Sequence, residues 1–555
     1  MLRLDVNFFD YLILAIYFAL VVTIGVLARR AIATSEDFLL SGRSLPAWVT
    51  GLAFISANLG AIEILGMAAN GAQYGIATVH FYWIGAVPAM IFLGLVMMPF
   101  YYGSKVRSVP EFLRRRFNAP THLFNAISFA AASVLTAGVN LYALALVIHA
   151  LIGWPTWVSI VVSAAFVLAY ITLGGLSGAI YNEVLQFFVI IAGLVPLVVI
   201  GLKNVGGWGG LQDKINKPEF FNSWSGTHVG GGWTNPLGDW IGIVMGLGFV
   251  LSFGYWTTNF AEVQRALSAK DLSAAQRTPL IGSFPKIFIP GLTIIPGLIA
   301  VAVIPKFGSA TGLAYNDAIP ALMNQFLPNG TLGIALAGLL AAFMAGMAAN
   351  VSSFNTVFTY DIWQTYIRKG RRDGYYLRVG RAVTVIGILI GIGTAFIASG
   401  YTNIMNYIQL LFSYFNAPLF ATFIIAMFWK RATPWSGVSG LAAGTLGAYL
   451  MHIFGYNIGY FYPGGTVVSH AKINVQMLNF YGAIVAFVAD AVVTVAVTMV
   501  TRPKPESELG GLVWGIPDPN APDPSTIPKP KWWASPKVLG GTSAAIVVVL
   551  SLIFT

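Results

Sequence analysis

The chain has 555 residues, of which 57% are hydrophobic and only 9% are charged. Soluble domains carry about 25% charged residues, so this composition excludes an ordinary soluble protein and indicates a polytopic membrane protein. The chain has no cysteine, which excludes disulfides and cysteine-ligated metal or iron–sulfur sites. The net charge of +11 would suit a nucleic-acid partner, but the distribution of the basic residues indicates another role.

About fourteen apolar segments follow one another along the chain, and each is typical of a transmembrane helix. They begin near Phe9, Leu45, His80, Thr121, Trp154, Val184, Asp239, Leu280, Leu332, Ala382, Asn403, Ser436, Met477 and Lys537. We expect the first to be a retained span, because Asp5 and Asp10 precede it and no small-residue cleavage site follows.

The basic residues predict which loops face the cytoplasm. Most of the 31 Lys and Arg residues lie in loops that follow odd-numbered segments, with clusters at residues 114–116 and 368–381. Cytoplasmic loops carry such an excess, so we expect a protein of the plasma (inner) membrane with both termini outside. The positive charge then sets topology, and we expect neither a nucleic-acid partner nor an obligate protein partner.

The chain is expected to contain two five-helix repeats. Each opens with an apolar segment interrupted by small and polar residues, at residues 56–61 in the first and 251–259 in the second. Because five is odd, the second repeat must be inverted relative to the first, as in secondary transporters whose site lies at the repeat interface. The predicted regions are a first transmembrane helix with its cytoplasmic connection (1–44), the first repeat (45–206), an external loop (207–235), the second repeat (236–429), two accessory helices (430–502), a cytoplasmic Pro-rich linker (503–536) and a last transmembrane helix (537–555).

The first interruption is the feature around which the chain is organised. A helix broken at mid-membrane is tolerated only where the freed carbonyl and amide groups line a cavity, and such groups bind cations and solutes. Asn58 lies at the interruption and Glu63 about one helical turn beyond it. A packing seam of small residues between helices is the alternative, but it leaves these two polar residues unexplained.

Several motifs resemble the sodium/solute symporter family, and in particular its sodium–glucose cotransporter branch. They are residues 35–46 followed by 56–60, residues 109–117, residues 174–186, Tyr255-Trp256 with Gln264-Arg265, and residues 428–430. The resemblance runs from about Phe9 to the end of the twelfth segment. It implies an all-α polytopic membrane protein of the leucine-transporter type, with about 14 transmembrane helices, a 5+5 inverted-repeat core and two broken helices.

The resemblance also implies a solute pocket. The residues that it assigns to the pocket are Asn58, Glu63, Tyr82, Thr136, Ser252, Tyr255, Trp256, Lys286 and Gln409. Tyr255 would be the inner gate and Trp256 a stacking surface. Glu63 and Tyr82 stand where sugar-binding relatives have a glutamine and a glutamate, which alters two polar contacts, so a sugar, a polyol and a small organic acid all stay open as solutes.

The family's sodium site falls on the backbone carbonyls of Ser56, Leu59 and Ala342. Its two hydroxyl positions hold Ala345 and Gly346, which have no side-chain oxygen, whereas sodium is a hard cation that takes oxygen ligands. The sodium site would therefore keep only its carbonyl ligands.

Glu63, Glu183 and Lys286 are ionisable groups in apolar segments or at their ends. Such groups at membrane depth are functional or paired with one another. We expect Glu63 and Glu183 to serve in coupling, with Glu63 either carrying a proton or staying ionised against Lys286. Sodium, a proton and no ion at all thus stay open as the driving ion.

Three kinds of function follow from these features. The first is a secondary active symporter that imports a small polar organic solute by alternating access, with a sodium-independent or proton-coupled transporter on the same fold as the alternative. The second is a non-transporting solute sensor. The third, an enzyme, is not expected, because no nucleophile–base pair or metal-ligand cluster appears in the sequence. No cofactor is expected beyond a coupling ion.

Overall fold

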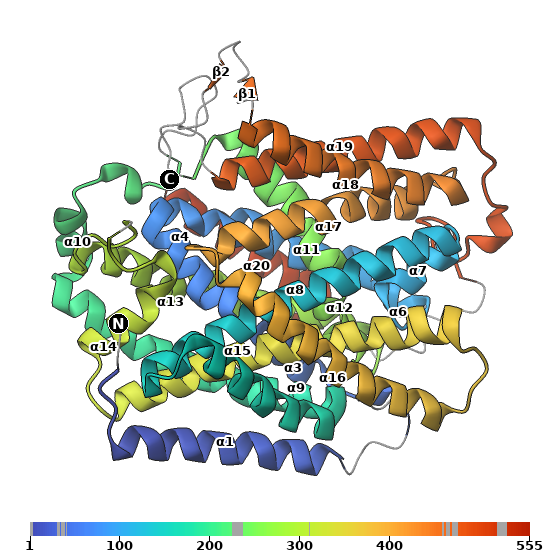
Figure 1. Ribbon diagram of the computed structural model, residues 1–555. Coiled ribbons are helices and arrows are strands. Elements are labelled where there is room, and N and C mark those ends of the chain that lie inside the picture. Colours follow the sequence, from blue (N-terminus) through green and yellow to red (C-terminus); the bar gives the residue numbers. More distant parts are fainter. Residues whose placement is uncertain are drawn as a thin grey trace.

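A computed structural model describes residues 4–29, 34, 39, 41–224, 237–309, 311–457, 460–461, 467–468, 475–518 and 530–554, without the side chains of residues 169–175, 177 and 455–474. Parts of the motifs at residues 35–46 and 174–186, of the predicted external loop and of the Pro-rich linker therefore lie outside the described residues. The molecule is a bundle of helices that run roughly parallel or antiparallel to one another (Figure 1).

The first half of the chain contains η1 (Ser41–Arg43), α1 (Phe8–Arg29), α3 (Ala47–Asn58), η2 (Ile62–Gly66), α4 (Met67–Tyr74), η3 (Gly75–Val79), η4 (Phe81–Ala86), α5 (Val87–Phe92), η5 (Leu93–Met97), α6 (Met98–Gly103), α7 (Val109–Arg116), α8 (Ala119–Ile152), α9 (Thr156–Val205), α10 (Gly207–Ile215) and η6 (Pro218–Phe220). The second half contains η7 (Gly242–Ser252), α11 (Phe253–Thr258), α12 (Phe260–Leu267), α13 (Leu272–Val303), η8 (Tyr315–Asp317), α14 (Ala318–Phe326), α15 (Thr331–Thr356), η9 (Val357–Ile367), α16 (Asp373–Ala398), α17 (Ile404–Phe428), α18 (Pro434–Asn457), α19 (Val475–Val500), η11 (Glu506–Glu508), η13 (Trp532–Ala534) and α20 (Pro536–Ile553). Two short strands, β1 (Tyr460–Phe461) and β2 (Val467–Val468), pair antiparallel between α18 and α19.

Within the described part of the chain, 11 helices are long and apolar enough to cross a membrane, or up to 13 if each of two bent pairs is one span. The fifth predicted segment accounts for the difference from about fourteen. It corresponds to Thr156–Leu168, an apolar stretch of α9 that is shorter than a full span. The two ends of the chain lie at the same end of the bundle, and α7 and the connection from η9 to α16 lie at the other end (Figure 1).

Both predicted interruptions are present as bends. The chain turns by 57° between Ala47–Asn58 and Ile62–Val79, and by 48° between Gly242–Thr258 and Phe260–Leu267. The first bend coincides with the predicted stretch at residues 56–61. The second lies at Asn259, at the end of its predicted stretch, because Asn259 Oδ1 accepts a hydrogen bond from Ala261 N (2.9 Å) and so starts a new helix.

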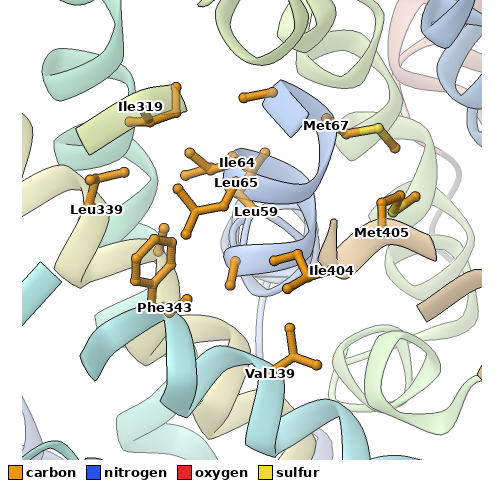
Figure 2. Close-up of a cluster of buried hydrophobic side chains, with 14 of the residues drawn as sticks. Leu59, Ile64, Leu65, Met67, Val139, Ile319, Leu339, Phe343, Ile404 and Met405 are labelled. Carbon is orange, nitrogen blue, oxygen red and sulfur yellow. The ribbon is translucent and has the colours of Figure 1, made fainter. Parts of the chain in front are cut away.

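The hydrophobic core surrounds the first broken helix. Figure 2 shows side chains from this helix packed against neighbours from α8, α14, α15 and α17. The labelled residues are Leu59, Ile64, Leu65, Met67, Val139, Ile319, Leu339, Phe343, Ile404 and Met405. Because the break lies inside this packed region, the backbone groups that it frees must find partners within the protein.

Glycine allows α13 to cross close to α4. A Cβ atom on Gly297 would lie 2.0 Å from the carbonyl oxygen of Ala68 and 2.7 Å from the amide nitrogen of Ala72. Small residues at helix crossings in membranes permit such close approach. We expect Gly297→Ala to reduce the free energy of unfolding by about 1–3 kcal/mol through overpacking, measured as a lower melting temperature in detergent.

Gly291 provides the control on the same helix. No atom lies within 4 Å of a Cβ built at Gly291, so Gly291→Ala should leave the melting temperature unchanged or raise it slightly, because alanine is the better helix former. Equal melting temperatures for the two variants would contradict the close crossing of α13 and α4.

Candidate functional site

A cavity of about 70 Å³ lies where the two broken helices meet η4, α8, α13, α15 and α17, with room for a few water molecules. All nine residues predicted for the solute pocket line it: Asn58, Glu63, Tyr82, Thr136, Ser252, Tyr255, Trp256, Lys286 and Gln409. They come from seven different elements, so only the tertiary fold brings them together.

Lys286 is the centre of the charges in this cavity. Its Nζ lies 2.8 Å from Glu63 Oε2 and donates a hydrogen bond to Asn58 Oδ1 at 2.5 Å. It also lies 4.9 Å and 5.1 Å from the ring centres of Tyr82 and Trp256, within the range of cation–π attraction. The side chains of Lys286 and Glu63 are only 3% and 5% exposed, so each keeps the other's charge compensated away from water.

Asn58 connects this ion pair to a second carboxylate. Its Nδ2 donates to Tyr255 OH at 3.1 Å and to Glu262 Oε1 at 3.5 Å. Tyr255 OH in turn donates to Glu262 Oε1 at 2.6 Å. The hydrogen bonds therefore run from Lys286 through Asn58 to Tyr255 and Glu262.

The sequence reasoning missed Glu262, which lines the cavity on α12, just beyond the second bend. The signal that could have found it is the one used for Glu63, a carboxylate inside an apolar segment at membrane depth. It also missed Asn140, whose side chain reaches the first break from α8.

The other predicted pocket residues differ in how free their polar atoms are. Thr136 Oγ1 donates to the carbonyl oxygen of Ala132 (2.9 Å) on its own helix, and Tyr82 OH shares a hydrogen bond with Thr293 Oγ1 (2.9 Å). Gln409 is 3% exposed, and its Oε1 has no partner among the described residues. Gln409 is thus the more available of these groups for a solute.

The carbonyl groups predicted to bind sodium lie beside the cavity rather than on its wall. Ser56, Leu59 and Ala342 are fully buried and do not line it. The carbonyl oxygen of Ser56 already accepts a hydrogen bond from Leu59 N (3.1 Å). Gly346, one of the two predicted hydroxyl positions, does reach the cavity.

Asn140 lies at the place where the hydroxyls are missing. Its Oδ1 accepts a hydrogen bond from Ala61 N (2.9 Å), a backbone group freed by the break. A Cβ atom on Gly346 would lie 2.4 Å from this oxygen, and one on Gly60 would lie 2.5 Å from it. The amide of Asn140 therefore fills the space that the two glycines leave open and satisfies the break.

Glu183, the second predicted coupling residue, lies outside the cavity. The guanidinium of Arg265 meets both of its carboxylate oxygens, Nε approaching Oε2 at 3.2 Å and Nη2 contacting Oε1. Both side chains are fully buried. This ion pair ties α9 to α12, the helix that carries Glu262.

A helical bundle with two broken helices around a buried, charged cavity is the architecture of a solute transporter of the membrane. The chain belongs to the sodium:solute symporter family, whose pattern matches residues 38–444. Membership identifies it as an integral membrane transporter of a small solute and not an enzyme, as the sequence predicted.

The chain is similar to sodium/glucose cotransporters of bacteria and animals. It is 28% identical to the sodium/glucose cotransporter of Vibrio parahaemolyticus, over 79% of this chain and 84% of that protein. It is 29% identical to sodium/glucose cotransporter 4 of Homo sapiens, over 92% of this chain and 79% of that protein.

Two solved structures share the fold. One is a substrate-bound, outward-open Na+-coupled sialic acid symporter (TM-score 0.73, 18% identity, 90% of this chain and 99% of that chain). The other is Mhp1, a nucleobase-cation-symport-1 family transporter in a closed conformation (TM-score 0.54, 15% identity, 85% of this chain and 96% of that chain). At these identities the likeness concerns the fold alone, and it confirms the predicted fold class.

Proposed function

We propose that this protein is a symporter that imports a small polar organic solute by alternating access, from outside the plasma (inner) membrane. The observation that supports this most directly is the meeting of the nine predicted pocket side chains at one buried cavity between the two broken helices. Secondary transporters bind solute and ion at such breaks, where half-helix ends and free carbonyls face the site.

The cavity favours a solute rich in hydrogen-bond donors. Among the described residues that line it, the buried polar atoms without a partner are Glu63 Oε1, Glu262 Oε2 and Gln409 Oε1. All three are acceptors. Hydroxyl groups suit them, whereas an anionic solute would meet two carboxylates. We therefore propose a sugar or polyol rather than an organic acid, and the sodium/glucose cotransporters among the relatives support this class.

The family makes sodium the first candidate for the driving ion. The carbonyl groups of Ser56, Leu59 and Ala342 would be its ligands in this proposal. One observation favours a proton as the second candidate: Gly346 offers no hydroxyl, and the amide of Asn140 lies against it. The coupling roles of Glu63 and Glu183 would then act through their ion pairs with Lys286 and Arg265.

Uptake of radiolabelled D-glucose and of a panel of polyols and organic acids into proteoliposomes tests the proposal. We expect a hydroxyl-rich solute to accumulate against its gradient. Replacing sodium with choline or potassium separates the ions, because proton coupling predicts persistent uptake that follows the pH gradient, while sodium coupling predicts saturable stimulation by sodium. Binding of a solute that is never transported would instead identify a solute sensor.

A pocket variant completes this test. Gln409→Ala should weaken solute binding by about 1–3 kcal/mol, because it removes a polar contact in a buried site. Thr136→Val is the matched control, since the Thr136 hydroxyl is already bonded to its own helix and its loss should matter less. Failure to transport any hydroxyl-rich solute, or equal affinities in wild type and Gln409→Ala, would contradict the proposal.

A further inference from the structure

Glu262 is a buried carboxylate that keeps one oxygen free. Its Oε1 accepts hydrogen bonds from Tyr255 OH (2.6 Å) and Asn58 Nδ2 (3.5 Å). Its Oε2 is buried and has no partner in the part of the chain that the structure describes. The residue as a whole is only 2% exposed, and it lines the same cavity as Glu63 and Lys286.

The positive charges near Glu262 already belong to other carboxylates. Lys286, from α13, is paired with Glu63 at 2.8 Å. Arg265, from α12 itself, is paired with Glu183 of α9. Described residues of this cluster thus comprise three carboxylates and two cations, and Glu262 is the carboxylate without an ion pair.

No other element packed against α12 supplies the missing charge. The sequences of α3 and α15 contain no Asp, Glu, Lys, Arg or His. α11 faces Glu262 with Tyr255, and α6 brings only the phenols Tyr101 and Tyr102, which are neutral. An uncompensated carboxylate at membrane depth is costly, so the cluster is expected to take up one further positive charge.

A proton fits this place better than a metal cation. Sodium would need several oxygen ligands, but the groups that meet Glu262 turn hydrogens toward it, from the Tyr255 hydroxyl and the Asn58 amide. A proton needs only the free oxygen. We infer that Glu262 Oε2 is a proton-binding site of this transporter.

The surroundings of Glu262 connect its proton to the solute cavity, and this part of the inference rests on the proposed function. A neutral carboxyl accepts a hydrogen bond more weakly than a carboxylate, so a proton on Glu262 loosens the hold on Tyr255, the predicted inner gate. Asn58 also changes one of its partners, and its other partner is Lys286. Proton binding thus reaches both the gate and the Lys286–Glu63 pair.

Infrared difference spectroscopy of the full-length protein in lipid tests the proton site without any solute. The probe is the proton itself, added by a shift from mildly alkaline to mildly acidic buffer. We expect the carbonyl-stretch band of a protonated carboxyl group to appear in wild type, to be lost in Glu262→Gln and to return, shifted, in Glu262→Asp. Absence of the band in wild type, or its full persistence in Glu262→Gln, would overturn the inference.

Asp490 offers the matched control. It is a fully buried carboxylate of α19 that accepts hydrogen bonds from Thr422 (2.7 Å) and Thr494 (3.1 Å), and it does not line the cavity. Asp490→Asn should therefore leave the Glu262 band in place. Loss of the same band in Asp490→Asn would assign it to Asp490 and overturn the inference.

A transport measurement separates this inference from the proposed function. Accumulation of radiolabelled D-glucose driven by a pH gradient should be present in wild type and Asp490→Asn and lost in Glu262→Gln. A wild type that shows the infrared band but transports nothing would contradict the proposed function and leave the proton site standing. Undiminished accumulation in Glu262→Gln would overturn the coupling role of Glu262.

Discussion

Replacing Arg265 with methionine should reduce the free energy of unfolding by about 3–5 kcal/mol, because it leaves the carboxylate of Glu183 buried without its cation. The guanidinium also donates to the carbonyl oxygen of Ala261 and to Gln264 Oε1, so several hydrogen bonds disappear with it. Thermal unfolding of the purified protein in detergent measures the change.

Two further variants show whether the ion pair is the cause. Arg265→Met combined with Glu183→Leu should recover most of the stability, because an apolar pair of similar volume carries no desolvation cost. Lys430→Met breaks the Lys430–Glu506 pair, whose side chains are 66% and 65% exposed, and should cost at most about 1 kcal/mol. If Arg265→Met were as stable as Lys430→Met, the buried pair would not hold α9 to α12.

The double variant also examines the coupling role of Glu183. A stable Arg265→Met/Glu183→Leu protein that still accumulates solute against its gradient would show that the pair is structural. A stable protein that exchanges solute but no longer accumulates it would support a part in coupling.

Replacing Lys286 with methionine should abolish solute binding and transport. The change leaves Glu63 without its ion-pair partner and takes the hydrogen bond away from Asn58 Oδ1. Leaving one member of a buried pair uncompensated costs about 3–5 kcal/mol, and each 1.4 kcal/mol or so is a tenfold change in affinity. We therefore expect at least a 100-fold loss of affinity, read from solute binding and from uptake into proteoliposomes.

Stability and function should separate when the partner is changed as well. Lys286→Met with Glu63→Leu should restore the melting temperature, because the unpaired charge is gone, but should not restore transport, since the cavity has lost its polar contacts. Uptake by Lys286→Met at the wild-type rate would remove Lys286 from the site.

The sequence by itself determined the class of fold and the first break. The low content of charged residues and the succession of apolar segments require a membrane-spanning helical bundle, because backbone polar groups in lipid must be satisfied within each helix. The small and polar residues at 56–61 interrupt one segment locally, and the bend appears there. Such features depend on neighbours in the chain, so they can be predicted without knowing the packing.

The list of pocket residues came from a resemblance, which assigned positions but no contacts. The structure places all nine on one cavity, yet it also shows that Thr136 is bonded to its own helix. Which polar atoms are free for a solute depends on hydrogen bonds between elements that are distant in the sequence.

Only the tertiary structure decided how the charges are matched. Lys286 reaches Glu63 because α13 packs against the first broken helix, and Arg265 reaches Glu183 because α12 lies against α9. That arrangement leaves Glu262 without a cation and brings Asn140 against Gly346. Ion pairs and close contacts act over a few ångströms, and the distances between helices are set by packing across the whole bundle, which no local stretch of sequence contains.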